Sequence, residues 1–60
     1  MLYDNVKAAA DKKKMTLSAV EREAQLAKGT ISKWKTVSPN LKSLTAVANV
    51  LNVSVSRLIR

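Results

Sequence analysis

Apolar side chains recur at helical spacing near the start of the chain. Leu2, Val6, Ala9 and Ala10 fall on one face when the chain is wound at 3.6 residues per turn. This spacing predicts a first helix over residues 2–13. A helix with one apolar face must bury that face against other elements, so the pattern also predicts a packed domain.

The same spacing returns in the last third of the chain, where the helix ends are marked more clearly. Asn40 is a good N-cap for a helix over residues 41–51, and Asn52 can adopt the left-handed conformation that ends it. Ser54 then caps a short last helix. The apolar stripe of the longer helix is Leu41, Leu44, Val47, Ala48 and Leu51, and the short helix holds Val55, Leu58 and Ile59.

Two further short helices are predicted between these regions, over residues 16–24 and 28–36. The first of them has two competing N-caps. Thr16 could cap a helix that opens at the next residue, whereas Ser18 with Glu21 three residues later reads as a capping box. The sequence alone leaves this choice open.

These elements together predict an all-α fold, a compact bundle of five short helices in one domain over residues 1–60. Helices two and three are separated by only about three residues, so they must cross steeply, as in a helix-turn-helix. The apolar residues expected to hold this crossing together are Val20, Ala24, Leu26, Ile31 and Trp34.

Helical phase divides the predicted third helix into an inner and an outer side. With Ile31 inward, Trp34 and Ala27 fall within about 60° of it, which favours a core position for the tryptophan over stacking on a nucleobase. Lys28 and Lys35 flank one edge. The outer residues are small, hydroxylated or cationic, namely Gly29, Ser32, Lys33 and Thr36, with Thr30 at the other edge.

Charge is distributed unevenly along the 60 residues, whose net charge is +7. Residues 1–23 carry five basic and all four acidic side chains, and therefore a net charge of +1. Residues 24–60 carry six basic side chains and no acidic one. A lopsided positive field on a folded domain favours a polyanionic partner, and it points to nucleic acid.

Lys28 is an unfavourable choice for the first turn of a helix, because the helix dipole disfavours a cation there. Neither Ala27 nor Lys28 supplies a capping oxygen, and Gly29 weakens a helix interior. A bound phosphate would relieve this conflict by taking up the free amides. Alternatively, Thr30 caps a later-starting helix and Lys28 lies in a loop.

Several functional classes are disfavoured by what the sequence lacks. The chain has no Cys and no His, so it offers no disulfide, no common zinc site and no nucleophile–base pair. We therefore expect no enzyme, no cofactor and no small-molecule substrate. No stretch approaches the roughly 18 apolar residues of a membrane span, and no signal peptide is evident, which makes a cytoplasmic protein the simplest interpretation.

Residues 15–59 resemble the phage repressor/Cro-type (XRE) helix-turn-helix family, which has a lambda-repressor-like five-helix fold. The closest likeness lies in KGTISKWK (28–35) and SPNLKSLTAVANVLNVSVSRL (38–58). The resemblance implies sequence-specific binding to double-stranded operator DNA for the control of transcription, usually as a homodimer on a pseudo-palindrome. It makes residues 28–36 the recognition helix of a repressor or related regulator.

Site residues follow from the resemblance position by position. The family's base-reading positions are matched by Lys28, Gly29, Ser32 and Lys33, to which the outward face adds Thr36. The phosphate-contacting positions are matched by Thr16, Leu17 through its backbone amide, Thr30, Asn40 and Lys42, and we add Ser18 and Lys35 to this group. Among them, Lys33 is expected to contact a guanine, because an ammonium can donate to both O6 and N7.

The chain departs from the family's pattern at three positions. Gln25 and Asn52 stand where the family usually has Gly, and Ala27 stands where a Ser or Thr cap is usual. These departures leave a second interpretation open, an engineered or drifted scaffold or protein-interaction module with weak or no operator binding. Leu58 and Ile59 could then pack on a partner instead of closing the core. A membrane-surface amphipathic peptide is a further alternative.

Overall fold

The computed structural model describes residues 2–60, which fold into helices and turns without any strand. The all-α prediction is therefore confirmed, but the number of α-helices is four and not five. The elements in chain order are α1 (Leu2–Lys12), α2 (Leu17–Glu23), the short 3₁₀ helix η1 (Ser32–Lys35), α3 (Leu41–Leu51) and α4 (Val55–Leu58).

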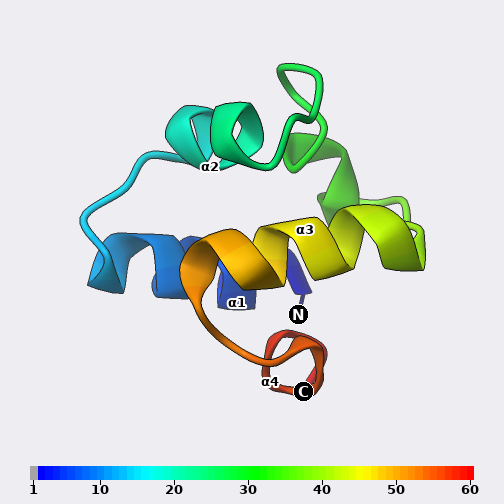
Figure 1. The fold of residues 1–60 in the computed structure, drawn as a ribbon. Coiled ribbons are helices and arrows are strands. Elements are labelled where there is room, and N and C mark those ends of the chain that lie inside the picture. The colour runs from blue at the N-terminus through cyan, green and yellow to red at the C-terminus, as the bar shows by residue number, and fades with distance from the viewer. Residues whose placement is uncertain (1) are drawn as a thin grey trace.

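The helices pack around a common core (Figure 1). In this view α3 runs across the front of α1, with α2 above both of them and α4 below. α1 contacts η1, α2 and α4, while α3 contacts α2 and α4. The loop between α2 and η1 rises at the top of the molecule, on the side opposite α4. That loop belongs to the segment predicted to contact DNA.

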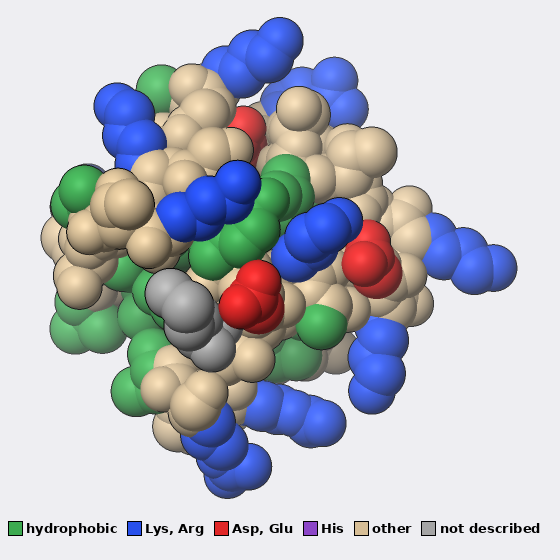
Figure 2. Space-filling view, turned by 180° about the vertical axis from the view of Figure 1, so that it is seen from behind, with side chains coloured by type: hydrophobic (Ala, Val, Ile, Leu, Met, Phe, Trp, Pro, Cys, Tyr) green, Lys and Arg blue, Asp and Glu red, His purple; other side chains and the backbone are tan. Residues whose placement is uncertain are grey.

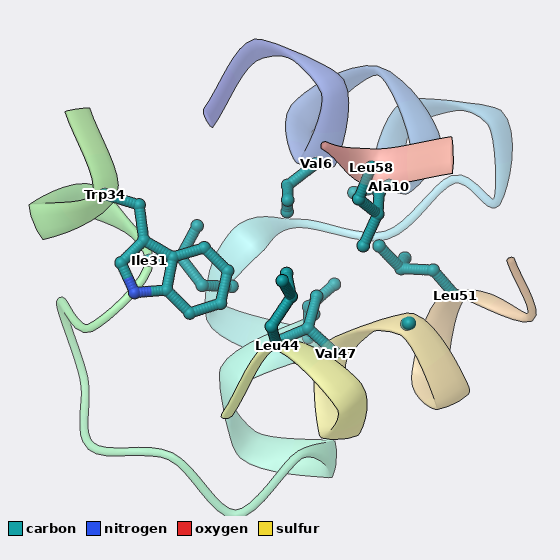
Figure 3. Close-up of a cluster of buried hydrophobic side chains, with 10 residues drawn as sticks. Val6, Ala10, Ile31, Trp34, Leu44, Val47, Leu51 and Leu58 are labelled. Atoms are coloured by element: carbon teal, nitrogen blue, oxygen red, sulfur yellow. The ribbon is translucent and has the colours of Figure 1, made fainter. Parts of the chain in front are cut away.

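All the elements contribute to one cluster of buried apolar side chains (Figure 3). Ile31 is fully buried and Trp34 is 7% exposed, so the predicted inward direction of the third segment is confirmed. Figure 3 shows both side chains pointing from the α2–α3 connection toward the rest of the cluster. The other buried members are Val6, Ala10, Val20, Leu44, Val47, Ala48, Leu51 and Leu58.

Two apolar residues assigned to the core lie outside it. Leu41 is 71% exposed because it is the first residue of α3, whose N-terminal end projects beyond the other helices in Figure 1. Ile59 is 59% exposed, whereas its neighbour Leu58 is buried. Ile59 follows the last residue of α4 as its C-cap, and it points away from the side of α4 that buries Leu58.

Helix starts follow the local caps in the sequence. The side-chain oxygen of Thr16 accepts a hydrogen bond from the Ala19 amide (3.1 Å), and that of Asn40 accepts one from the Ser43 amide (2.7 Å). Ser54 caps α4 in the same manner. The choice left open in α2 is therefore settled in favour of Thr16, and the capping box that begins at Ser18 is wrong.

The two ends of the chain are tied together by one side chain in α1. The Nδ2 group of Asn5 donates to the backbone carbonyls of Leu58 (2.7 Å) and Arg60 (2.8 Å). This link holds the residues after α4 against α1. Within residues 2–60 no helix has both the length and the apolar character that crossing a membrane requires.

Candidate nucleic-acid interface

α2 ends in a Schellman motif centred on Gln25. The Gln25 amide donates to the Arg22 carbonyl (3.1 Å), and the Leu26 amide donates to the Glu21 carbonyl (2.8 Å). Gln25 has a φ of 60°, which is the left-handed conformation that the family resemblance implied for this position. The motif turns the chain sharply away from α2 and starts the connection that leads to η1.

The recognition helix predicted over residues 28–36 is wrong in its first half. Residues 28–31 form hydrogen-bonded turns, and only Ser32–Lys35 is helical, as one turn of 3₁₀ helix. Gly29 has a φ of 89°, outside the range of a right-handed helix. The alternative in which Lys28 lies in a loop is therefore correct. Thr30, however, does not cap the later helix, because its hydroxyl donates to the Ala27 carbonyl (2.7 Å).

Glu21 explains why the turn takes this shape. Its side chain is 4% exposed, and its Oε1 and Oε2 atoms accept hydrogen bonds from the backbone amides of Gly29 (3.1 Å) and Ile31 (2.8 Å). The carboxylate thus occupies amides that the sequence analysis left for a phosphate. Our reasoning from sequence missed this role because the bonds span eight and ten residues. The one hint in the sequence was that an acidic residue, Glu21, directly follows Val20, which was expected to be buried.

The predicted base-contacting residues lie on the outer side of this segment. Lys28, Ser32, Lys33 and Thr36 are exposed, and Gly29 is half-buried. A Cβ atom added to Gly29 would meet no heavy atom within 4 Å, so the glycine faces open space. Its backbone is thus accessible to a closely approaching partner.

Ala27 was predicted to lie on the buried edge beside Ile31 and is exposed instead. The helical phase that placed it there does not apply, because residues 26 and 27 precede the first turn of the segment and are not helical. Trp34 kept its predicted direction. Trp34 lies three positions after Ile31, and this spacing is one turn of a 3₁₀ helix as well as nearly one turn of an α-helix.

The predicted phosphate-contacting residues fall into two groups. Those at the helix starts lie at or near the surface: Thr16, Ser18, Asn40 and Lys42 are exposed and Leu17 is half-buried. The other two are Thr30, whose hydroxyl already donates to Ala27, and Lys35, whose Nζ atom lies 4.8 Å from the centre of the Tyr3 ring. Lys35 is therefore directed toward α1.

Three candidate contact points lie across the molecule in the view of Figure 1. The α2–η1 loop stands between the first residues of α2 and those of α3. The caps Thr16 and Asn40 mark these two helix starts, where amides of the first turn lack partners within the helix. In this view the loop thus lies between two positively polarised helix ends.

Basic side chains outnumber acidic ones in the sequence around the loop. Residues 24–60 contain no acidic side chain, and the nearby Glu21 is buried and bound to two amides, so Glu23 at the end of α2 is the exposed acid that directly precedes the loop. The face seen from behind in Figure 2 differs, because acidic side chains there stand between the basic ones. On α1, for example, Lys7 and Asp11 approach each other to 4.0 Å. The loop side is therefore the better surface for a polyanion.

In residues 2–60 no three His, Cys, Asp or Glu side chains gather closely enough to hold a metal ion. Two of these residue types, His and Cys, are missing from the sequence altogether. The outward residues of the α2–η1 segment offer hydroxyls and ammonium groups, from Ser32, Thr36, Lys28 and Lys33.

Comparison with known proteins gives one finding that bears on this surface. A family model described as winged helix-turn-helix DNA-binding matches residues 2–59. The match therefore covers every element of the fold, from the start of α1 to the end of α4. Searches of curated proteins and of solved structures gave no match.

Proposed function

The chain belongs to the winged helix-turn-helix DNA-binding family, and we propose that it regulates transcription by reading a specific duplex sequence with residues 28–36. One observation carries this proposal. Ile31 and Trp34 anchor the segment in the core, while Lys28, Ser32 and Lys33 point to solvent on a surface without acidic neighbours in residues 24–60. Ammonium and hydroxyl groups in this setting suit base edges and phosphates.

Within the helix-turn-helix proteins, we favour the repressor/Cro type that the sequence resembles. A wing is a β-hairpin, and residues 2–60 contain no strand. The order of four α-helices with a shorter helical turn at the third place supports the five-segment plan of that type. The proposed regulator is a repressor, and it binds as a homodimer to two half-sites.

Base readout is assigned to the outward residues of the turn and of η1. Lys33 contacts a guanine, because its ammonium can donate to both O6 and N7. Ser32 and Thr36 add weaker contacts to base edges or to a thymine methyl group. Lys28 flanks them, and the uncovered backbone at Gly29 permits close approach to the duplex.

Phosphate contacts are assigned to the starts of α2 and α3. Thr16, Leu17 and Ser18 offer hydroxyls and first-turn amides at one end, and Asn40 and Lys42 do so at the other. Thr30 and Lys35 complete the proposed set of phosphate-contacting residues. If about five phosphates are neutralised, the logarithm of the binding constant should fall with the logarithm of salt concentration at a slope of about −4 to −5.

Selection from random duplex DNA with the purified domain tests the proposal. We expect an enriched motif with two-fold symmetry, because a homodimer presents two copies of the same surface. Absence of enrichment, or a salt slope near zero, would instead support a scaffold or protein-interaction module. The departure of Gln25 from the usual Gly favours that second candidate, since a left-handed non-glycine residue weakens the turn.

A pair of lysine variants tests the division of roles. Lys33→Ala should relax the base preference at one position of the selected motif. Lys42→Ala should weaken binding to all duplexes about equally and reduce the salt slope by about 1. Equal behaviour of the two variants would contradict the assignment of one lysine to bases and the other to phosphate.

A further inference from the structure

Glu21 is a buried acid inside a surface that should attract a polyanion. We infer that Glu21 is a positioning residue, which fixes residues 28–33 in the conformation that contacts DNA and thereby raises affinity and sequence preference. This inference rests on the proposed function, because it concerns the same surface. It assigns to an acidic side chain a favourable effect on DNA binding.

The geometry of the carboxylate supports this role. Both oxygens are engaged, Oε1 by the Gly29 amide at 3.1 Å and Oε2 by the Ile31 amide at 2.8 Å. Hydrogen bonds to an ionised acceptor are roughly twice as strong as those between neutral groups. At 4% exposure the carboxylate is shielded from water, so the two amides have no competing acceptor there.

Apart from Glu21, the segment is held by the burial of Ile31 and by short-range hydrogen bonds such as that from the Thr30 hydroxyl to the Ala27 carbonyl. Residues 28–31 lack the hydrogen-bond ladder of an α-helix, and the start of η1 has no side-chain cap. Without the carboxylate, the turn at Gly29 would sample other conformations and would have to be ordered when DNA binds. Ordering a loop on binding lowers affinity, so a side chain that orders it beforehand raises affinity.

Glu23 provides a matched control for the charge of Glu21. It is the last residue of α2, its side chain is exposed, and it stands two positions from Glu21. Replacing either residue by Gln removes one negative charge. If only the net charge of the domain affected DNA binding, both substitutions would strengthen it, because each removes a negative charge. The positioning role predicts the opposite sign for Glu21→Gln, because the new amide group directs N–H donors at a backbone amide that needs an acceptor.

Binding of the wild-type chain, Glu21→Gln and Glu23→Gln should be compared on the duplex selected by the wild type and on a random-sequence duplex. We expect Glu21→Gln to weaken binding to the selected duplex about tenfold and to the random duplex less than twofold. Its salt slope should match that of the wild type, since no phosphate contact is lost. Glu23→Gln should bind both duplexes at least as tightly as the wild type.

The inference is overturned if folded Glu21→Gln binds the selected duplex as tightly as Glu23→Gln does. Circular dichroism at the assay temperature identifies the folded variants. A second measurement needs no variant, namely hydrogen exchange of the wild-type amides. Gly29 and Ile31 amides should exchange at least about tenfold more slowly than an unprotected amide, and unprotected rates for both would overturn the inference even if Glu21→Gln does not fold.

The two proposals fail in different ways. If the wild type selects no duplex, the proposed function is wrong, and the exchange rates still decide whether Glu21 holds the turn. If the wild type selects a duplex and Glu21→Gln keeps its full preference for it, the function stands and the positioning role is wrong.

Discussion

The ends of α2 and α3 are built alike, but the chain continues from them in different ways. Gln25 and Asn52 have φ values of 60° and 57°, and each sits in a Schellman motif with the same pair of backbone hydrogen bonds. After Asn52, the next helix begins three residues later, at Val55, under the local cap Ser54. After Gln25, no local cap follows, and Glu21 supplies the missing acceptor from α2.

The difference shows that one connection is specified by local sequence and the other by tertiary contacts. The stretch from α3 to α4 is specified by neighbours in sequence, which act over three or four residues. The α2–η1 connection is specified by burial of Ile31 and Trp34 and by a carboxylate eight residues away. A segment held in the second way can adopt a turn that helix propensity does not favour, while the side chains of Lys28, Ser32 and Lys33 stay exposed.

The largest expected effect concerns the anchoring of this connection in the core. Ile31→Ala removes a fully buried side chain and should lower the free energy of unfolding by about 2–5 kcal/mol, because it leaves a cavity. A domain of this size has about 3–5 kcal/mol in total, so the variant should be largely unfolded in thermal melts followed by circular dichroism. Leu41→Ala is the control, with an expected change within about 0.5 kcal/mol because Leu41 is 71% exposed. Similar melts for the two variants would contradict the anchoring role.

A smaller effect separates a true local cap from an apparent one. Asn40→Ala removes the acceptor for the Ser43 amide and should lower the free energy of unfolding by about 1 kcal/mol. Ser18→Ala removes a hydroxyl that caps nothing and should change that energy by less than about 0.5 kcal/mol. Urea unfolding of both variants measures the difference. A loss for Ser18→Ala as large as that for Asn40→Ala would argue that the box at Ser18 forms in solution.

The parts of the fold that were predictable from sequence are those with local causes. Asn40, Asn52 and Ser54 act on their own helix ends, and the structure places each in its expected role. The choice between Thr16 and Ser18 was open because both offer the same chemistry two residues apart. Leu41 and Ile59 were misplaced since periodicity gives a direction but not the extent of the neighbouring elements that would cover it.

The sequence predicted which side of residues 28–36 faces the core, but it did not predict the backbone conformation of that segment. Ile31 and Trp34 share a side in both 3₁₀ and α geometry, so the inward face was correct although residues 28–31 are not helical. The turn itself depends on Gly29 at positive φ and on Glu21 reaching across it. Gly29 was visible in the sequence as a weak point for a helix, but the contact of Glu21 is tertiary and does not appear in a window of a few residues.

A glycine substitution sharpens the comparison between the two Schellman motifs. Gln25→Gly should raise the free energy of unfolding by about 0.5–1 kcal/mol, because it removes left-handed strain that exceeds the entropy glycine adds to the unfolded chain. Asn52→Gly should give less, since Asn tolerates this conformation better than Gln. Urea midpoints at constant slope provide the measurement. An equal or larger gain at Asn52 would mean that strain at Gln25 is relieved by its surroundings.

The smallest expected effect tests whether Lys35 serves the fold or stays available to DNA. Its Nζ atom lies 4.8 Å from the centre of the Tyr3 ring, and such a contact at an exposed site is worth about 0.5 kcal/mol. Tyr3→Leu keeps an apolar side chain against the core but removes the ring, so it should lower the free energy of unfolding slightly and release Lys35. Tyr3→Phe keeps a ring face for the cation and is the control. If the contact competes with phosphate binding, Tyr3→Leu should bind random duplex DNA more tightly than Tyr3→Phe does, whereas equal affinities would show that Lys35 reaches the backbone from its place over the ring.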